Sequence, residues 1–314
     1  MTEEQALDCH ALGQDLQAQG KHSEAIAQFN LAADYFKSVE GPDSPDLANV
    51  LSDTADSLLA LCRYEDAESA ARQAKSIIEK VHDLLDADTR RTLLPHVLTL
   101  WGQTLRELGR YEEAAGPLTK AVQEAEAGFG PDSAEVAQYL NNYGILCKYW
   151  GRFEEGEQTY QRALRLLEDE FGKESPETAT LYHNLGGLEH TRGNFERGEP
   201  LARKAYEIRR QSLGEDHEAT VADAVAWGGL LDGLGRFDES VPIYRRALAY
   251  YEARLGPDHF EVAATLNNLG LALAEQGHTQ EGKQLLERCL AIKRKLFGED
   301  HPEVKLTRQN LSNL

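Results

Sequence analysis

Three histidines, His217, His259 and His301, recur at a constant spacing of 42 residues and are the first candidates for chemistry. Imidazole is a common metal ligand, and a metal ion holds its ligands at about 2 Å. Packed helices lie about 8–10 Å apart, so equivalent residues of successive two-helix units are too far apart to share one ion. We therefore interpret these histidines as turn residues and predict no metal site.

No other pattern of catalytic residues occurs. The sequence contains no HExxH, P-loop or GxSxG motif, and no Cys/His pair has a supporting context. Its four cysteines, Cys9, Cys62, Cys147 and Cys289, lie far apart and form no CxxC pair. This spacing predicts reduced thiols in a cytoplasmic protein. We expect neither a catalytic residue nor a cofactor.

Two adjacent asparagines, Asn267 and Asn268, are a different kind of candidate. They lie in the stretch TLNNLG, although Asn is a poor helix former because its amide competes with the backbone for hydrogen bonds. The neighbouring Leu266, Leu269 and Leu273 have the i, i+3, i+7 spacing of an amphipathic helix. The pattern therefore predicts a helix that carries two amides beside its apolar stripe.

An internal repeat must position these residues. A turn with the pattern Gly-x-Tyr/Phe-x-Glu recurs every 42 residues from Gly109 to a looser copy at Gly277, and weaker copies begin at Gly20 and Cys62. A second marker, GPDS, GKES, GPDH or GEDH, keeps the same period. No stretch alternates with a period of two, so we predict helices and no strands.

Each unit is predicted to contain two helices joined by the glycine turn. An acidic or serine residue of the second marker is expected to cap the first helix, with Glu135, Glu177, Glu261 and Glu303 placed as in a capping box. A small residue in the middle of each helix predicts close helix packing. These residues are Gly13, Ala55, Gly102, Gly144, Gly186, Gly228 and Gly270 in the first helices, and Ala25, Ala67, Ala114, Gly156, Gly198, Ser240 and Gly282 in the second helices.

The motifs NLG…QG, GRFEEGEQTYQRAL and LGEDH resemble tetratricopeptide repeats (TPR) of the 42-residue kinesin-light-chain type. The resemblance covers essentially the whole chain. It implies an all-α superhelix, a TPR solenoid of seven helix-turn-helix repeats plus a C-terminal capping helix. We therefore expect residues 1–314 to form a single solenoid.

One step between repeats is irregular. Cys62 and Gly109 are 47 residues apart instead of 42, and the intervening residues 82–95 allow two interpretations, a longer turn or a flexible joint. Pro95 lies near the start of the next first helix, where we expect it to break or bend the helix.

The resemblance also implies that the first helices line a concave groove and the second helices form the outer wall. Counted from the small residue of a first helix, the groove positions are −6, −3, −2, +1, +4 and +5. In the resembled family, asparagines in the slot of Asn142, Asn184 and Asn268 bind the backbone of a peptide, and an amide can both donate and accept. The predicted peptide-binding residues are Arg106, Gln138, Asn141, Asn142, Lys148, Tyr149, His183, Asn184, His190, Asn267 and Asn268.

The chain departs from this family pattern at two places. Only Arg106 and Lys148 are basic at these groove positions, so we expect neither a carboxylate clamp nor capture of Trp-acidic motifs. Repeat 6 places Trp227 beside small and apolar residues. Trp227 either fills a leucine slot of the core or lines an apolar pocket.

Charge narrows the class of partner. The formal net charge is −20, which opposes binding to nucleic acid or to an anionic membrane surface. No apolar run approaches the ~20 residues of a membrane helix, and the N-terminal stretch MTEEQALDCHALGQ does not resemble a signal peptide. These observations predict a cytoplasmic protein.

We predict a non-enzymatic adaptor or scaffold that binds a peptide segment of a partner protein in the groove. One alternative is a regulatory sensor whose groove binds a short signalling peptide or a small ligand. The other is an accessory subunit of a signalling or protease complex that binds through its second helices. The oligomeric state is not predicted.

Overall fold

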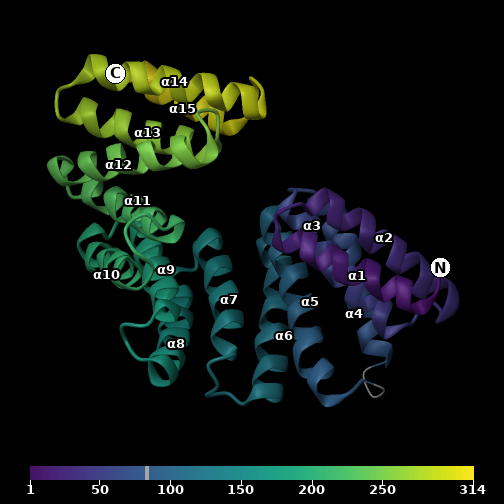
Figure 1. Cartoon of the computed structure of the whole chain (residues 1–314). Coiled ribbons are helices and arrows are strands. Elements are labelled where there is room, and N and C mark those ends of the chain that lie inside the picture. Colours follow the sequence, from purple (N-terminus) through teal and green to yellow (C-terminus); the bar gives the residue numbers. More distant parts are fainter. Residues whose placement is uncertain (82–84) are drawn as a thin grey trace. The chain divides into compact units, whose positions relative to one another are not determined.

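The computed structural model describes residues 1–81 and 85–314, and these residues form α-helices joined by short turns, with no strand among them (Figure 1). The helices are α1 (Glu3–Ala18), α2 (His22–Val39), α3 (Pro45–Ala60), α4 (Tyr64–Val81), α5 (Ala87–Glu107), α6 (Tyr111–Phe129), α7 (Val136–Trp150), α8 (Phe153–Phe171), α9 (Pro176–Arg192), α10 (Phe195–Leu213), α11 (Glu218–Gly233), α12 (Phe237–Leu255), α13 (Phe260–Glu275), α14 (Thr279–Phe297) and α15 (Pro302–Ser312). Odd-numbered helices up to α13 are the first helices of seven pairs, and α15 follows the last pair. The predicted all-α repeat architecture is confirmed.

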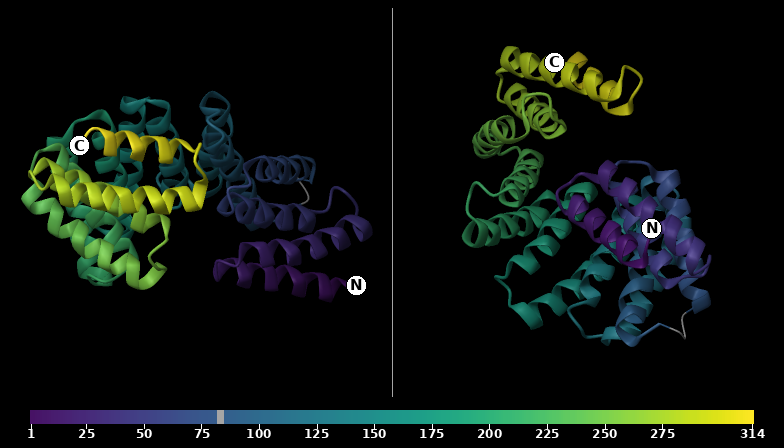
Figure 2. Two further views of the ribbon diagram at one scale, coloured as in Figure 1. Left: turned by 90° about the horizontal axis from the view of Figure 1, so that it is seen from above. Right: turned by 45° about the vertical axis from the view of Figure 1, so that its right-hand side comes forward.

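Helices that are consecutive in the sequence pack against each other. The pairs α1–α2, α5–α6, α9–α10 and α13–α14 have extensive contacts, and α15 packs against α14 at the C-terminal end (Figure 2). These contacts group the described residues into two compact units, residues 1–166 and 167–314, with the boundary inside α8. A single solenoid over the whole chain stays a prediction.

Small residues bring the paired helices close together. The fourteen small residues predicted for this role are all buried. A Cβ atom built on Gly282 of α14 would lie 2.5 Å from the carbonyl oxygen of Gly270 in α13. In the other unit, a Cβ atom on Gly144 of α7 would lie 2.6 Å from Cε1 of Tyr160 in α8. Neither position has room for a methyl group, which confirms the predicted close packing.

The apolar stripe of α13 is buried as predicted. Leu266, Leu269 and Leu273 are at most 2% exposed, and side chains of α12 and α14 pack against them. Asn267 and Asn268 are only half-buried. The two amides therefore lie at the edge of the packed face, beside the stripe.

The glycine turns end the first helices in the left-handed conformation. Gly151, for example, has φ 76° at the end of α7. Cys62 occupies the glycine position of its turn and has φ 57°, the one positive φ of a non-glycine residue in the described chain. The cysteine therefore adopts the backbone conformation that its place in the repeat requires.

The predicted caps of the first helices are partly wrong. Ser175 caps α9 through its hydroxyl, but α11, α13 and α15 are capped by His217, His259 and His301. In each of these three, Nδ1 accepts a hydrogen bond from the backbone N–H two residues later at 3.2 Å. The acidic residues of the marker lie one position too early, because the extended residue directly before the helix provides the cap.

The expected break at Pro95 does not occur. Pro95 is buried inside α5, which is an unbroken helix of 21 residues from Ala87 to Glu107. Asp86 caps this helix, accepting from the N–H groups of Asp88 and Thr89 at 2.9 Å each, and Leu93 and Leu94 are buried. Capping and burial thus hold the turns before the proline in place. A flexible joint was considered for residues 82–95, and residues 82–84 of this segment lie outside the described residues.

We predict that Gly282→Ala destabilises the protein by about 1–3 kcal/mol, because overpacking outweighs the ~0.5–1 kcal/mol that alanine normally gains over glycine in a helix. Gly229→Ala is the matched control, since its added Cβ would meet its nearest atom at 3.5 Å, an ordinary contact. Urea denaturation followed by circular dichroism measures both. Equal stabilisation by the two changes would contradict the close approach at Gly282.

We predict that His259→Ala costs about 1 kcal/mol, the usual effect of removing a side-chain N-cap, and that His259→Ser restores most of it. His278→Ala is the control, because His278 precedes α14 without a side-chain cap hydrogen bond. Amide hydrogen exchange in the first turn of α13 should accelerate only in His259→Ala. Equal exchange in the wild type and in His259→Ala would show that the cap contributes nothing.

Candidate functional site

In the first unit, amides at groove positions connect neighbouring first helices. Gln103 of α5 donates from Nε2 to Oδ1 of Asn142 in α7 at 2.6 Å. Asn142 in turn donates from Nδ2 to the backbone oxygen of Gln138, one turn earlier, at 2.9 Å. The side chain of Asn142 is thereby held in one orientation while it stays half-buried.

In the second unit, the asparagines of TLNNLG make the same kind of connection. Asn310 of α15 donates to Oδ1 of Asn267 in α13 at 3.1 Å. Asn267 donates to Oδ1 of the adjacent Asn268 at 3.3 Å. These amides therefore link the last pair of helices to the C-terminal helix.

His183 is held by a buried ion pair. Its Nδ1 lies 2.7 Å from Oδ1 of Asp223 in α11, and Arg209 of α10 donates to the same oxygen at 2.7 Å. Asp223 is fully buried, whereas the His183 side chain is 35% exposed. An ionised carboxylate can only accept hydrogen bonds. Asp223 therefore orients the His183 ring so that a protonated Nδ1 faces the carboxylate.

The other predicted residues of these helices differ in exposure. Asn141 and Asn184 are half-buried, and Gln138 is exposed. His190 is exposed near the end of α9, where its ring meets the edge of Phe195 with 5.6 Å between centroids.

Arg106, Lys148 and Tyr149 form a cationic cluster where α5 and α7 end. The Tyr149 ring is 58% exposed, with the Arg106 guanidinium 5.8 Å and the Lys148 ammonium 5.6 Å from its centroid. Arg106 also donates to Glu107 at 2.6 Å. Burial lowers the pKa of Lys148 below the usual value for lysine, because removal from water disfavours the charged form.

The first two repeats carry related pairs that sequence reasoning missed. Asp53 of α3 accepts from Gln14 at 2.8 Å and lies 2.7 Å from Nε2 of His10, both in α1. Gln17 donates to Asp56 at 2.6 Å. All five residues occupy groove positions. The same count from the small residues Gly13 and Ala55 would therefore have identified them in the sequence.

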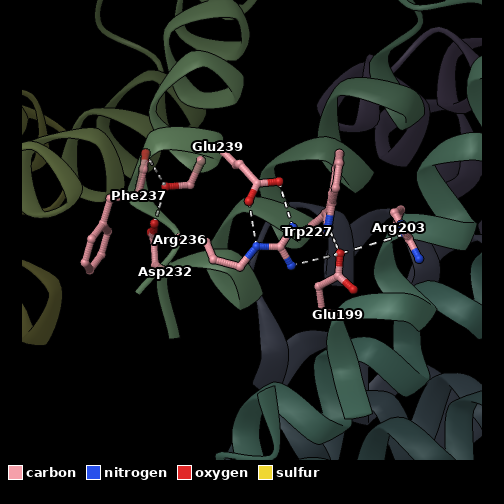
Figure 3. A network of polar contacts seen from close by, with 8 residues as sticks. Glu199, Arg203, Trp227, Asp232, Arg236, Phe237 and Glu239 are labelled. Carbon is pink, nitrogen blue, oxygen red and sulfur yellow. Dashed lines mark hydrogen bonds and ion pairs between the residues drawn. The ribbon is translucent and has the colours of Figure 1, made fainter. Parts of the chain in front are cut away.

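Trp227 packs back against the preceding helix (Figure 3). Its ring is half-buried and stacks on Tyr206 with 5.5 Å between centroids, and Nε1 donates to Oε1 of Glu199 at 2.9 Å. The same oxygen lies 3.6 Å from Arg236 and 3.8 Å from Arg203. Trp227 is therefore part of a polar network with α10, unlike either a core leucine or the wall of an apolar pocket.

The described residues contain no group of three or more His, Cys, Asp or Glu side chains that could hold a metal ion. None of their helices is both long and apolar enough to cross a membrane.

The repeat geometry agrees with the family comparison. The model of the tetratricopeptide repeat matches residues 5–80, 93–169, 150–211, 177–253, 224–295 and 261–314. The chain belongs to the tetratricopeptide repeat family. No curated protein matches this TPR protein.

Solved structures show the same fold at low sequence identity. BtubC, a protein also named BKLC, from P. vanneervenii has a TM-score of 0.63 at 20% identity, covering 76% of this chain and 94% of that chain. The apo form of RapI has a TM-score of 0.68 at 15% identity, covering 93% and 98%. The Rap conjugation gene regulator of plasmid pLS20, in complex with the Phr* peptide, has a TM-score of 0.62 at 16% identity, covering 92% and 75%.

We predict that the Lys148 ammonium titrates below the pH range of lysine in a short unstructured peptide, because burial disfavours its charged form. Nuclear magnetic resonance of ¹³C-dimethylated lysines measures the titration, and the Lys148→Met variant identifies the resonance. A titration at or above the value for the unstructured peptide would contradict the burial of this ammonium.

Proposed function

We propose that this TPR protein is a non-enzymatic adaptor or scaffold that binds a peptide segment of a partner protein at the groove positions of its first helices. The observation that carries the proposal is the arrangement of half-buried amides at these positions. They are oriented by neighbours within the fold and still reach the surface.

The internal hydrogen bonds of Asn142 leave capacity for a ligand. Its Oδ1 has two lone pairs and accepts one bond, from Gln103, and its Nδ2 has two hydrogens and donates one, to Gln138. One donor and one acceptor remain at a fixed place. A peptide unit offers one acceptor and one donor, so an amide of this kind can bind backbone with little dependence on ligand sequence.

The same count applies to Asn267 in the second unit. It accepts one hydrogen bond from Asn310 and donates one to Asn268. One donor hydrogen and one acceptor lone pair of its amide therefore remain. His183 adds a ring whose orientation Asp223 determines. Each unit thus presents oriented polar groups, and we propose peptide binding for each of them.

The solved relatives support a peptide as ligand. The pLS20 regulator resembles this chain in fold and was solved with the Phr* peptide. The same relative supports the alternative of a regulatory sensor that binds a short signalling peptide. An accessory subunit that binds through its second helices is the third candidate.

We predict that Asn142→Ala together with Asn184→Ala weakens peptide binding about tenfold or more, the change that corresponds to ~1.4 kcal/mol of lost hydrogen bonding. A partner captured from a cell lysate is divided into overlapping synthetic peptides, and fluorescence polarisation measures their affinities. One segment should bind the wild type and lose affinity for the double variant.

The matched control is Gln73→Ala together with Gln161→Ala, two exposed amides on the second helices α4 and α8. Circular dichroism confirms that both double variants remain folded. If the groove variant binds as tightly as the wild type while the control loses affinity, the partner binds the second helices, as expected of an accessory subunit. A change in the radius of gyration on peptide addition, measured by small-angle scattering, identifies a sensor.

A further inference from the structure

The second unit contains a cavity between three consecutive helices, α10, α11 and α12. Its volume is about 50 Å³, and its apolar wall consists of Val221 and Ala224 of α11 with Ile243 and Ala247 of α12. The ring of Tyr206 in α10 forms a further part of the wall. Counted from the small residue of α11, its two residues lie at −7 and −4, which are not groove positions. The cavity is therefore separate from the positions proposed for peptide binding.

The short side chain of Ala224 leaves room in this wall. The first helices of repeats 2 to 5 and of repeat 7 carry a large side chain at the same position, namely Leu51, Leu98, Leu140, Tyr182 and Leu266. Of these, Leu98 and Leu266 are at most 1% exposed, so the position is one at which a leucine fills the space between helices. Relative to leucine, alanine removes the branched end of the side chain, and the surroundings of such a deletion close only in part.

One polar atom of the cavity wall lacks a partner. Thr220 lines the cavity and is fully buried, and its hydroxyl oxygen has no hydrogen-bond partner among the described residues. The equivalent Thr178 of α9 donates to the backbone oxygen of Ser175 at 2.7 Å. The equivalent positions of α7 and α13 carry the buried Val136 and Val262. An unsatisfied buried hydroxyl is unfavourable, and a ligand in the cavity would supply the hydrogen bond.

An ion pair lies at the edge of the cavity. Glu215, just before α11, and Arg246 of α12 both line it, and Oε2 of the carboxylate is 2.8 Å from Nη1 of the guanidinium. Arg246 also donates to Asp216 at 3.2 Å. The side chains of Arg246 and Glu215 are 45% and 51% exposed, so the cavity reaches solvent here. Because the guanidinium is already neutralised by carboxylates, this entrance does not favour an anionic ligand.

Stacking holds the tyrosine wall in place. The ring of Tyr206 lies on that of Trp227 with 5.5 Å between centroids, and Nε1 of Trp227 donates to Glu199 at 2.9 Å. A wall that is fixed in this way does not have to be ordered when a ligand binds, which lowers the cost of binding.

We propose that this cavity binds a small neutral molecule with a short aliphatic group and one hydroxyl group. A cavity of about 150 Å³ accommodates benzene, so about 50 Å³ suits roughly two to four heavy atoms. The apolar wall disfavours a charged group, which would lose its hydration there. The ligand hydroxyl would form the missing hydrogen bond with Thr220. An aliphatic side chain of a partner protein offers no such group, so the observations favour a free alcohol.

The test follows methyl groups of the cavity wall by nuclear magnetic resonance. Protein with ¹³C-labelled isoleucine and valine methyl groups is titrated with isopropanol, with xenon as an apolar probe and with isopropylammonium as a charged probe. We expect isopropanol to shift the resonances of Val221 and Ile243 saturably, with the millimolar affinity of a ligand of so few atoms. Isopropylammonium should leave them unchanged. The Val221→Ala and Ile243→Val variants identify the two resonances.

Two variants test the two features of the wall separately. Ala224→Leu should fill the cavity, abolish binding of both isopropanol and xenon, and raise the melting temperature. Ala249→Leu, the same change at an exposed position of α12, is the matched control and should do none of these. Thr220→Val keeps the shape of the wall, so it should weaken isopropanol binding about tenfold while xenon binds as before. This variant tests the site even if Ala224→Leu does not fold, which circular dichroism determines.

Four outcomes would overturn the proposal. No saturable shift with isopropanol would show that the cavity holds water only. Xenon binding without isopropanol binding, or equal isopropanol affinity in the wild type and Thr220→Val, would remove the role of the hydroxyl. Tighter binding of N-acetyl-valine amide than of isopropanol would identify a side chain of a partner protein as the occupant. None of these measurements involves the groove amides, so peptide binding stands or falls separately.

Discussion

The close approach of paired helices at small side chains is the constraint on which the rest of this structure depends. Gly282 lies so near the Gly270 carbonyl that a methyl group would come within 2.5 Å of the oxygen. The large apolar residues of α13 can then pack closely against its neighbours α12 and α14. Because packing holds the helices, their other positions need not favour a helix. Two asparagines in sequence, each unfavourable by at most ~0.7 kcal/mol, are readily tolerated there.

The polar side chains at the groove positions connect one repeat to the next. Gln103 and Asn142 join α5 to α7, and Asn267 and Asn310 join α13 to α15. A ligand that bonds to one of these amides therefore acts on a group that also stabilises the packing between repeats. Binding and stability are linked in this way, since a ligand that prefers the packed arrangement also stabilises it. This link connects the adaptor and the sensor interpretations, because both use the same contacts.

The fold could be predicted from the sequence because its signals recur in register. A single glycine turn is weak evidence, but the turn and the buried small residues repeat with the same period. Cys62 shows the strength of that register, because it adopts φ 57° in a glycine position. Caps were harder to predict, since residue preferences favoured an acidic side chain and the structure uses Nδ1 of His259 and its equivalents. Pro95 was misjudged because burial around it outweighs one missing hydrogen bond.

The candidate site could be predicted only in part. Register places His10, Asp53 and Asn142 on the same side of their helices, but it does not show which neighbours they contact. Asp223 lies outside the groove positions and yet orients His183, because the two helices bring together residues 40 positions apart. The orientation of Trp227 toward Glu199 likewise depends on the helix before it. Pairwise contacts between repeats are tertiary features that no single helix pattern contains.

Lys148 shows how a local environment can oppose the average charge of a chain. With 53 acidic and 33 basic side chains, carboxylates are abundant, yet none in the described chain pairs with this ammonium. Burial without a partner is unfavourable for a charge, and an apolar side chain of similar length would avoid the loss of hydration. Lys148 is nevertheless only half-buried, and its ammonium lies 5.6 Å from the centroid of the exposed Tyr149 ring, so a cation–π contact offsets part of that loss.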